Sequence, residues 1–244
     1  MAVKANHDIS SGLETAFINS AINSNLAYRP EFVSNDYTQG KKVSVAIERE
    51  LRHCDAFYIS VAFITEGGLA PLKQVLAELR DKGIPGKILT TSYLTFTEPK
   101  ALKTLANLSN VEVRVYDSTD EGASGFHTKG YIFKEEEIYR FIVGSSNMTA
   151  SAFSVNKEWN TKLVSTSDGE LLKQMMTEFN ALWNNEHTYA VEDFIEDYEV
   201  RYKLIKEQKK NAAKEQMVDL QAYKLQPNKM QARFVSNFRK LLES

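Results

Sequence analysis

The chain has 244 residues, of which 43% are hydrophobic and 25% are charged, so it is long enough to bury the core of one large domain. Its 30 basic and 32 acidic residues give a formal net charge of −2, which excludes a generally basic nucleic-acid coat protein. The single cysteine, Cys54, excludes an internal disulfide framework and a thiolate zinc cluster. Any anion-binding site must therefore come from a local group of residues.

The sequence carries no sign of a membrane segment or a signal peptide. Its longest strongly apolar run without charges, residues 56–65, is too short to span a bilayer as a helix. The first residues include His7, Asp8 and Glu14, where a signal peptide needs an apolar stretch. We therefore expect a soluble, cytoplasmic protein without a membrane partner.

The first half of the chain predicts alternating helices and strands. A weak helical period over 11–24 comes first, and a loop over 35–40 follows. Apolar side chains at helical spacing then predict helices at residues 43–51, 69–79 and 99–108. Between these helices, β-rich runs predict strands at residues 56–64, 87–91 and 111–116. The order predicts parallel strands joined by right-handed crossovers, with the doubly apolar run 56–64 in the middle of a covered sheet.

After residue 116 the pattern changes from crossovers to a hairpin. Two β-type runs, 127–133 and 137–143, are separated by three glutamates at 135–137. A further strand is expected over 159–166 and a helix over 171–183. The whole predicts an α/β fold with a mixed, mostly parallel sheet that is flanked by helices on both faces.

The C-terminal part differs in charge from the rest. Residues 186–199 are acidic, whereas residues 201–215 are rich in lysine and arginine. This basic run is typical of a solvated helix that leads out of a domain, and contact with a phosphate backbone is the alternative. Residues 216–244 are too few to hold a core of their own. We predict a domain over 1–200 and a helical extension over 201–244.

His127 is the histidine that the pattern connects with chemistry. It begins a predicted strand, and Lys129, two residues later, points to the same face of that strand. The hairpin returns the next strand to this point, which places Ser145 and Asn147 near His127. An imidazole can attack phosphorus, and the ammonium, hydroxyl and amide groups can stabilise a phosphoryl oxyanion. Since no Asp/Glu cluster suited to magnesium adjoins these residues, a route without metal or other cofactor is favoured.

Together with Glu158-Trp159-Asn160, the motifs His127-x-Lys129 and Gly144-Ser145-x-Asn147 resemble the HKD signature of the phospholipase D superfamily. The similarity is greatest to the nuclease-like branch, which has one motif per chain. It implies a phospholipase D-like fold in which His127 is a nucleophile that forms a phosphohistidine, while a second histidine protonates the leaving group. It also implies that Lys129 and Asn147 hold the phosphate with help from Ser145, and that Glu158 supports the histidine.

One position departs from the family signature. The family has an aspartate five residues after the lysine, and here that position is Lys134. The adjacent Glu135 would face the opposite side of a strand. The change disfavours a phospholipase more than a nuclease, because nuclease relatives can lack this aspartate. We expect Lys134 and Lys157 to belong to a basic lining that binds the substrate.

A narrower resemblance concerns the wider context of the domain. Residues 60–65, 87–93 and 126–129 are similar to the domain at the N-terminus of some bacterial DEAD/DEAH-type helicases associated with restriction or defence. Residues 225–231 resemble the short sequence that opens such a helicase core. The GxxxxGK[ST] phosphate loop is missing from the chain, so no ATP binding is predicted. The resemblance implies an N-terminal piece of a longer protein whose helicase core is not included.

These patterns predict a metal-independent phosphodiesterase that cleaves DNA as a homodimer. None of the other histidines, His7, His53 and His187, is followed by a lysine two residues later, so a second copy of His127 is expected to complete the site. Alternatively, His187 or a partner protein supplies the acid. The competing functions are a catalytically silent DNA-binding module that positions a helicase and a phospholipase, which the lack of an amphipathic basic helix disfavours.

Overall fold

A computed structural model describes residues 2–222, with side chains described for 4–212. The chain divides into two compact units, Met1–Val200 and Arg201–Ser244. Residues 225–231, which resemble the start of a helicase core, lie outside the described part. No helix among the described residues combines the length and the apolar character needed to cross a membrane.

Within the described part of the chain, eight strands form one sheet in the order β1-β7-β6-β5-β2-β3-β4-β8. The strands are β1 (Glu31–Val33), β2 (Ala56–Val61), β3 (Gly86–Thr91), β4 (Val111–Tyr116), β5 (Lys129–Glu135), β6 (Ile138–Gly144), β7 (Asn160–Thr166) and β8 (Thr188–Ala190). Strand β2 lies between β3 and β5, so the prediction that this doubly apolar run is central is confirmed.

The sheet is mixed, as predicted, but most of its pairings are antiparallel. Parallel pairing joins β2 to β3 and β3 to β4. All the other pairings between the described strands are antiparallel. The expectation of a mostly parallel sheet is therefore wrong outside β2–β4. The reason is that the chain after β4 continues through a hairpin, which can only join antiparallel strands.

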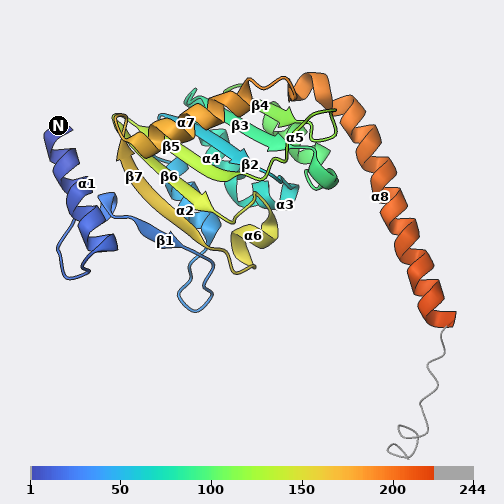
Figure 1. The fold of residues 1–244 in the computed structure, drawn as a ribbon, viewed down its shortest axis with the longest axis horizontal. Helices are drawn as coiled ribbons and strands as arrows, with labels where there is room; N and C mark the ends of the chain where they lie inside the picture. Colours follow the sequence, from blue (N-terminus) through green and yellow to red (C-terminus); the bar gives the residue numbers. More distant parts are fainter. Residues whose placement is uncertain (1, 223–244) are drawn as a thin grey trace, which may run out of the picture. The chain divides into compact units, whose positions relative to one another are not determined.

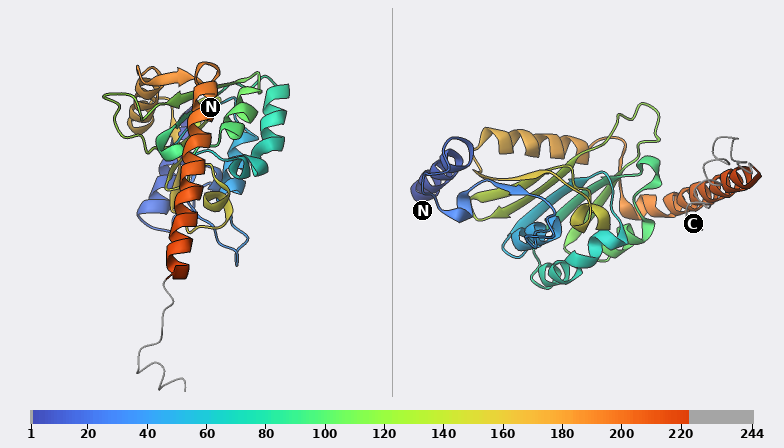
Figure 2. Two further views of the ribbon diagram at one scale, coloured as in Figure 1. Left: turned by 90° about the vertical axis from the view of Figure 1, so that its right-hand side faces the viewer. Right: turned by 90° about the horizontal axis from the view of Figure 1, so that it is seen from below.

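Helices cover both faces of the sheet, which confirms this part of the prediction. Helix α7 lies on one face, and α2 to α6 lie on the other (Figures 1 and 2). The helices are α1 (Ala2–Phe17), α2 (Val43–Leu51), α3 (Glu66–Leu69), α4 (Lys73–Asp81), α5 (Pro99–Ala106), α6 (Ala150–Ser154), α7 (Glu170–Trp183) and α8 (Val191–Ala222). The predicted helix over 201–215 lies within α8. Short 3-10 turns occur at Leu26–Tyr28, Ala70–Leu72 and Tyr93–Thr95.

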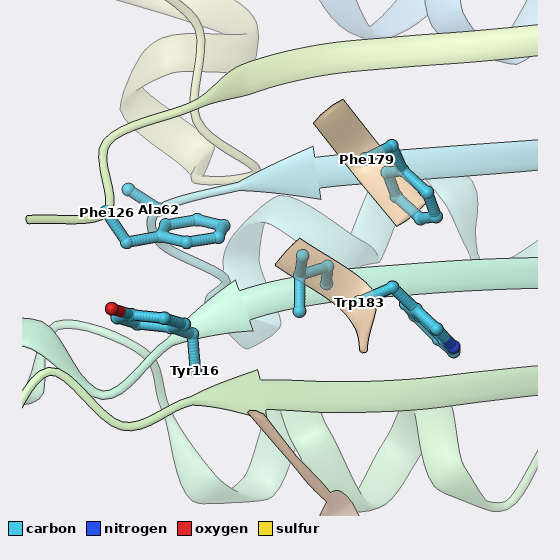
Figure 3. Packing of buried hydrophobic residues seen from close by; sticks show 6 residues of the cluster. Ala62, Tyr116, Phe126, Phe179 and Trp183 are labelled. Carbon is cyan, nitrogen blue, oxygen red and sulfur yellow. The ribbon is translucent and has the colours of Figure 1, made fainter. Parts of the chain in front are cut away.

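An aromatic cluster under α7 fixes the entry of the chain into β5. The rings of Tyr116, at the end of β4, and Phe126 are stacked with centroids 5.5 Å apart (Figure 3). Phe179 and Trp183 of α7 complete the cluster with Ala62 and Leu89 (Figure 3). Because Phe126 is buried here, the backbone of the next residue, His127, starts from a fixed point.

A buried ion network supports β7 on the opposite face of the sheet. The side chain of Lys162 is only 3% exposed. Its Nζ donates to Glu31 Oε1 at 2.8 Å and to Glu50 Oε1 at 3.4 Å. Burial raises the pKa of Glu31, but the hydrogen bonds from Lys162 and Arg49 outweigh it, so the net pKa is lowered. The network ties β1 and α2 to the strand that begins next to Glu158.

Candidate active site

The structure brings the predicted motif residues to one end of the sheet. Gly130 pairs with Val143, and Gly144 pairs with Asn160. The start of β5, with His127 and Lys129, therefore lies beside the end of β6, where Ser145 and Asn147 follow. This is the arrangement that the predicted hairpin requires.

Ser145 and Glu158 are joined directly. Ser145 Oγ donates a hydrogen bond to Glu158 Oε2 and accepts one from Trp159 N at 3.1 Å. Glu158 is buried, with 7% of its surface exposed. A side chain at Gly144 would put a Cβ atom 2.2 Å from Trp159 O, so only glycine lets β6 approach the start of β7 this closely.

The charge of the same buried carboxylate acts on Lys129. Its Nζ donates to the carbonyl oxygen of His127 at 3.1 Å. Burial lowers the pKa of Lys129, and the negative charge of Glu158 opposes this effect. Beneath them, burial and the charge of Glu158 raise the pKa of Tyr131, whose hydroxyl donates to Ser146 O at 3.0 Å. Lys129 is thus a partly dehydrated cation, which interacts with an anion more strongly than a fully hydrated one.

Asn147 and His127 both contact Phe63, which follows β2. Asn147 Oδ1 accepts a hydrogen bond from Phe63 N at 3.1 Å, so its NH₂ group is the end that can donate to a ligand. The exposed imidazole of His127 lies edge-on to the Phe63 ring, with centroids 6.1 Å apart. Sequence reasoning missed Phe63, because an apolar residue at the end of a core strand carries no sign of a site.

The loop that leads to His127 is tied down at both ends. Two hydrogen bonds hold Thr128 to the β2 segment. One joins its Oγ1 and Ser60 Oγ at 2.6 Å, and in the other Ala62 N donates to the carbonyl oxygen of Thr128 at 3.0 Å. Earlier in the loop, Asp120 accepts a hydrogen bond from Tyr189 OH at 2.7 Å. His187 Nδ1 lies 3.3 Å from the same carboxylate. His187 therefore serves to hold the loop in this structure.

Comparison with known families identifies the domain. Residues 53–183, more than half of the chain, match the family model described as cardiolipin synthase, PLD-like domain. The chain belongs to this PLD-like family. No curated protein matches the chain.

Two solved structures share the PLD-like fold. One is a phospholipase D family member, Nuc from Salmonella typhimurium, with 16% identity, a TM-score of 0.50, and coverage of 66% of this chain and 98% of that one. The other is NucT from Helicobacter pylori, with 15% identity, a TM-score of 0.51 and the same coverage of both chains. The predicted phospholipase D-like fold is confirmed.

The two lysines expected to bind substrate lie in different places in the PLD-like domain. Lys134 pairs with Ala56 at the far end of β5. It lies five positions after Lys129 along the strand, a distance of about 16 Å. The structure therefore does not bring Lys134 to the site, and this expectation is corrected. Lys157 is exposed and immediately precedes Glu158, so it lies at the rim.

The remaining motif residue of the PLD-like domain, Asn160, has a structural role. It is buried, and its Oδ1 accepts a hydrogen bond from Ser146 N at 3.3 Å. Its Nδ2 donates to Ser146 Oγ at 2.9 Å and to Val33 O at 3.1 Å. Asn160 thus fixes the backbone between Ser145 and Asn147. Among the described residues, no group of three or more His, Cys, Asp or Glu side chains is arranged to hold a metal ion.

Proposed function

We propose that this PLD-like domain is a metal-independent phosphodiesterase that cleaves DNA through a phosphohistidine on His127. The observation that carries the proposal is the convergence of Lys129, Ser145, Asn147 and Glu158 on the end of the sheet from which His127 extends. These groups provide a nucleophile, a cation and neutral donors around one small volume, as transfer of a phosphoryl group requires. Membership of the PLD-like family supports the same chemistry.

The proposed reaction has two steps. Neutral His127 attacks phosphorus, so a P–N bond forms while the P–O bond to the leaving strand breaks, and a second histidine gives its proton to the leaving oxygen. Water then attacks the phosphohistidine and loses a proton to the second histidine, and the P–N bond breaks. Lys129 and the NH₂ group of Asn147 stabilise the oxygens of phosphorus in both steps.

Glu158 acts in this proposal as a positioning residue. Its carboxylate accepts a hydrogen bond from Ser145, which fixes the end of β6, and its charge acts on Lys129, the cation that meets the phosphate. The family resemblance implies that Glu158 supports the histidine, and in this proposal it does so through the groups that it holds beside His127.

We propose that the second histidine is His127 of another copy of the chain. The attack needs a nucleophile on one side of phosphorus and an acid on the other, and His187 is already engaged with Asp120. A two-fold axis through the site would place two His127 side chains across one phosphate.

The helicase-linked context is the part of the proposal supported by sequence resemblance alone. According to this part of the proposal, the domain cleaves DNA as the N-terminal part of a restriction-type or defence-type helicase. A pull-down of the full-length protein with an ATPase assay would test this context independently of cleavage.

Cleavage of a supercoiled plasmid in EDTA tests the central proposal. We expect the wild type to nick the plasmid, His127→Ala to be inactive, and His7→Ala, at an exposed histidine of α1, to match the wild type. Plasmid that is bound but never cut would favour the silent DNA-binding module. Activity that EDTA abolishes and magnesium restores would contradict the metal-independent route.

A further inference from the structure

Beside the proposed phosphate site lies an aromatic wall that the mechanism does not use. The rings of Phe63 and Phe96 meet edge to face, with centroids 4.9 Å apart. Phe63 also contacts the imidazole of His127, so the wall is continuous with the proposed nucleophile. Phe96 is 48% exposed.

The backbone that presents Phe96 is strained. Leu94 and Thr95, which precede it, have positive φ angles of 51° and 56°. Such a conformation costs a non-glycine residue about 1–2 kcal/mol, and it persists only where the surroundings impose it. Here Thr97 imposes it, because this buried residue donates from Oγ1 to Thr91 O at 2.9 Å and accepts at its carbonyl oxygen from Tyr198 OH at 2.8 Å. The loop is thus clamped so that Phe96 faces Phe63.

The wall borders a hollow of about 620 Å³, which also touches Asn147 and Glu158. This volume lies within the range of about 300–1,000 Å³ that is usual for small-molecule sites. Two carboxylates, Glu98 and Glu158, line the hollow. Among the described residues that line it there is no lysine or arginine. Away from Lys129, which does not line the hollow, carboxylates and an aromatic wall disfavour a phosphate group and suit a neutral, flat group with hydrogen-bond donors.

We propose that Phe96, backed by Phe63, stacks against a nucleobase next to the phosphate that His127 attacks, so that the substrate is nucleic acid with unpaired bases, either a single strand or a locally melted part of a supercoiled plasmid. The inference rests on the proposed function, because it assumes a nucleic-acid phosphate at His127. In a duplex, neighbouring bases cover the faces of each base, whereas an unpaired base can turn out and stack on an aromatic side chain. The donors of the base would meet the carboxylates of the hollow.

Binding without cleavage tests the inference. The probe is a short fluorescein-labelled oligothymidylate, its affinity is measured by anisotropy, and the parent protein is His127→Ala, which leaves the probe intact. From the usual contribution of stacking one base, Phe96→Ala should weaken binding about 5- to 150-fold. Phe96→Trp should bind as tightly as the parent or tighter. Phe17→Ala removes an equally large ring that is 65% exposed on α1, and it should change nothing.

An abasic probe shows whether a base is what Phe96 meets. With the oligonucleotide that lacks the contacted base, Phe96→Ala should cause no further loss. Equal affinity of Phe96→Ala and its parent for the intact probe would overturn the inference, as would an equal loss with duplex DNA. If Phe96→Ala changes the oligomeric state in sedimentation but each dimer binds the probe as tightly as before, the inference is overturned, and the aromatic wall is a contact between two copies of the chain. A wild type that cleaves no plasmid would overturn the proposed function. The binding results would still decide whether Phe96 stacks on a base.

Discussion

Gly144→Ala is the substitution that most directly tests whether the approach of two strands builds the site. The added Cβ would lie 2.2 Å from Trp159 O and 2.6 Å from Asn160 Cα, whereas ordinary contacts begin at 3.4 Å. The end of β6 and the start of β7 must therefore separate by about 1 Å. Both atoms belong to backbone, so no side-chain rotation relieves the overlap. The separation would move Ser145 away from Glu158.

The expected effects follow from this displacement. Misplacement of reacting groups by about 1 Å costs about 100-fold in rate. Overpacking of this kind lowers the free energy of unfolding by about 1–3 kcal/mol. Plasmid cleavage in EDTA measures the first effect, and urea unfolding measures the second.

Gly130→Ala is the matched control on the neighbouring strand. A Cβ there would meet only Val143 Cγ1, at an ordinary 3.9 Å. This variant should fold as well as the wild type and cleave at a similar rate. The reasoning is refuted if Gly144→Ala cleaves as fast as the wild type, or if Gly130→Ala loses as much activity as Gly144→Ala.

Three further predictions concern charge and assembly. Lys162→Met should lower the free energy of unfolding at pH 7 by about 3 kcal/mol, because Glu50 is left buried without its lysine. In urea unfolding, the double variant with Glu50→Gln should recover part of this loss. Additive losses from the two substitutions would contradict the explanation. The pH–rate profile should be bell-shaped, because one His127 attacks while the His127 of the other copy donates a proton. Burial lowers the pKa of Lys129, so its charge is lost at a lower pH than the charge of an ordinary lysine. The proton donor sets the alkaline limb of the bell, so Lys129→Arg should leave that limb in place and remove only the further loss of activity at higher pH, where the charge of Lys129 disappears. A high-pH loss that is unchanged in Lys129→Arg would assign it to another group. Mixing His127→Ala with wild-type chains should reduce activity as the square of the wild-type fraction, whereas a linear fall would show that each chain carries a complete site.

The long elements of the fold could be predicted because their apolar residues repeat often enough to show a period. The alternation over 111–116 and the helical spacing over 171–183 are examples, and both elements are present. Strands β1 and β8 have three residues each, which is too short for a period. Their pairing depends on partners far away in the chain, such as Val33 with Asn160. No local pattern can indicate such a pairing.

The site could be predicted where one hairpin fixes the geometry. The positions of His127, Lys129 and Ser145 follow from the register of β5 and β6. The expectation that Lys134 lines the site fails, because Lys134 lies five positions after Lys129 on an extended strand, near the other end of β5. Phe96 escaped prediction because the positive φ angles that orient it occur at leucine and threonine, which rarely adopt them.

The three-residue strands β1 and β8 limit pairing between this sheet and the sheets of other molecules. Residues 53–183 end on one side with β7 and on the other with β4, each of which has backbone groups that would be open to a further strand. Strands β1 and β8, which come from outside that segment, pair with them. A long unpaired edge invites aggregation, whereas a very short strand is a poor template for another chain. The family-matching segment expressed alone would therefore expose two longer open edges, and the flanking residues shorten the edges through which the PLD-like core could pair with another sheet.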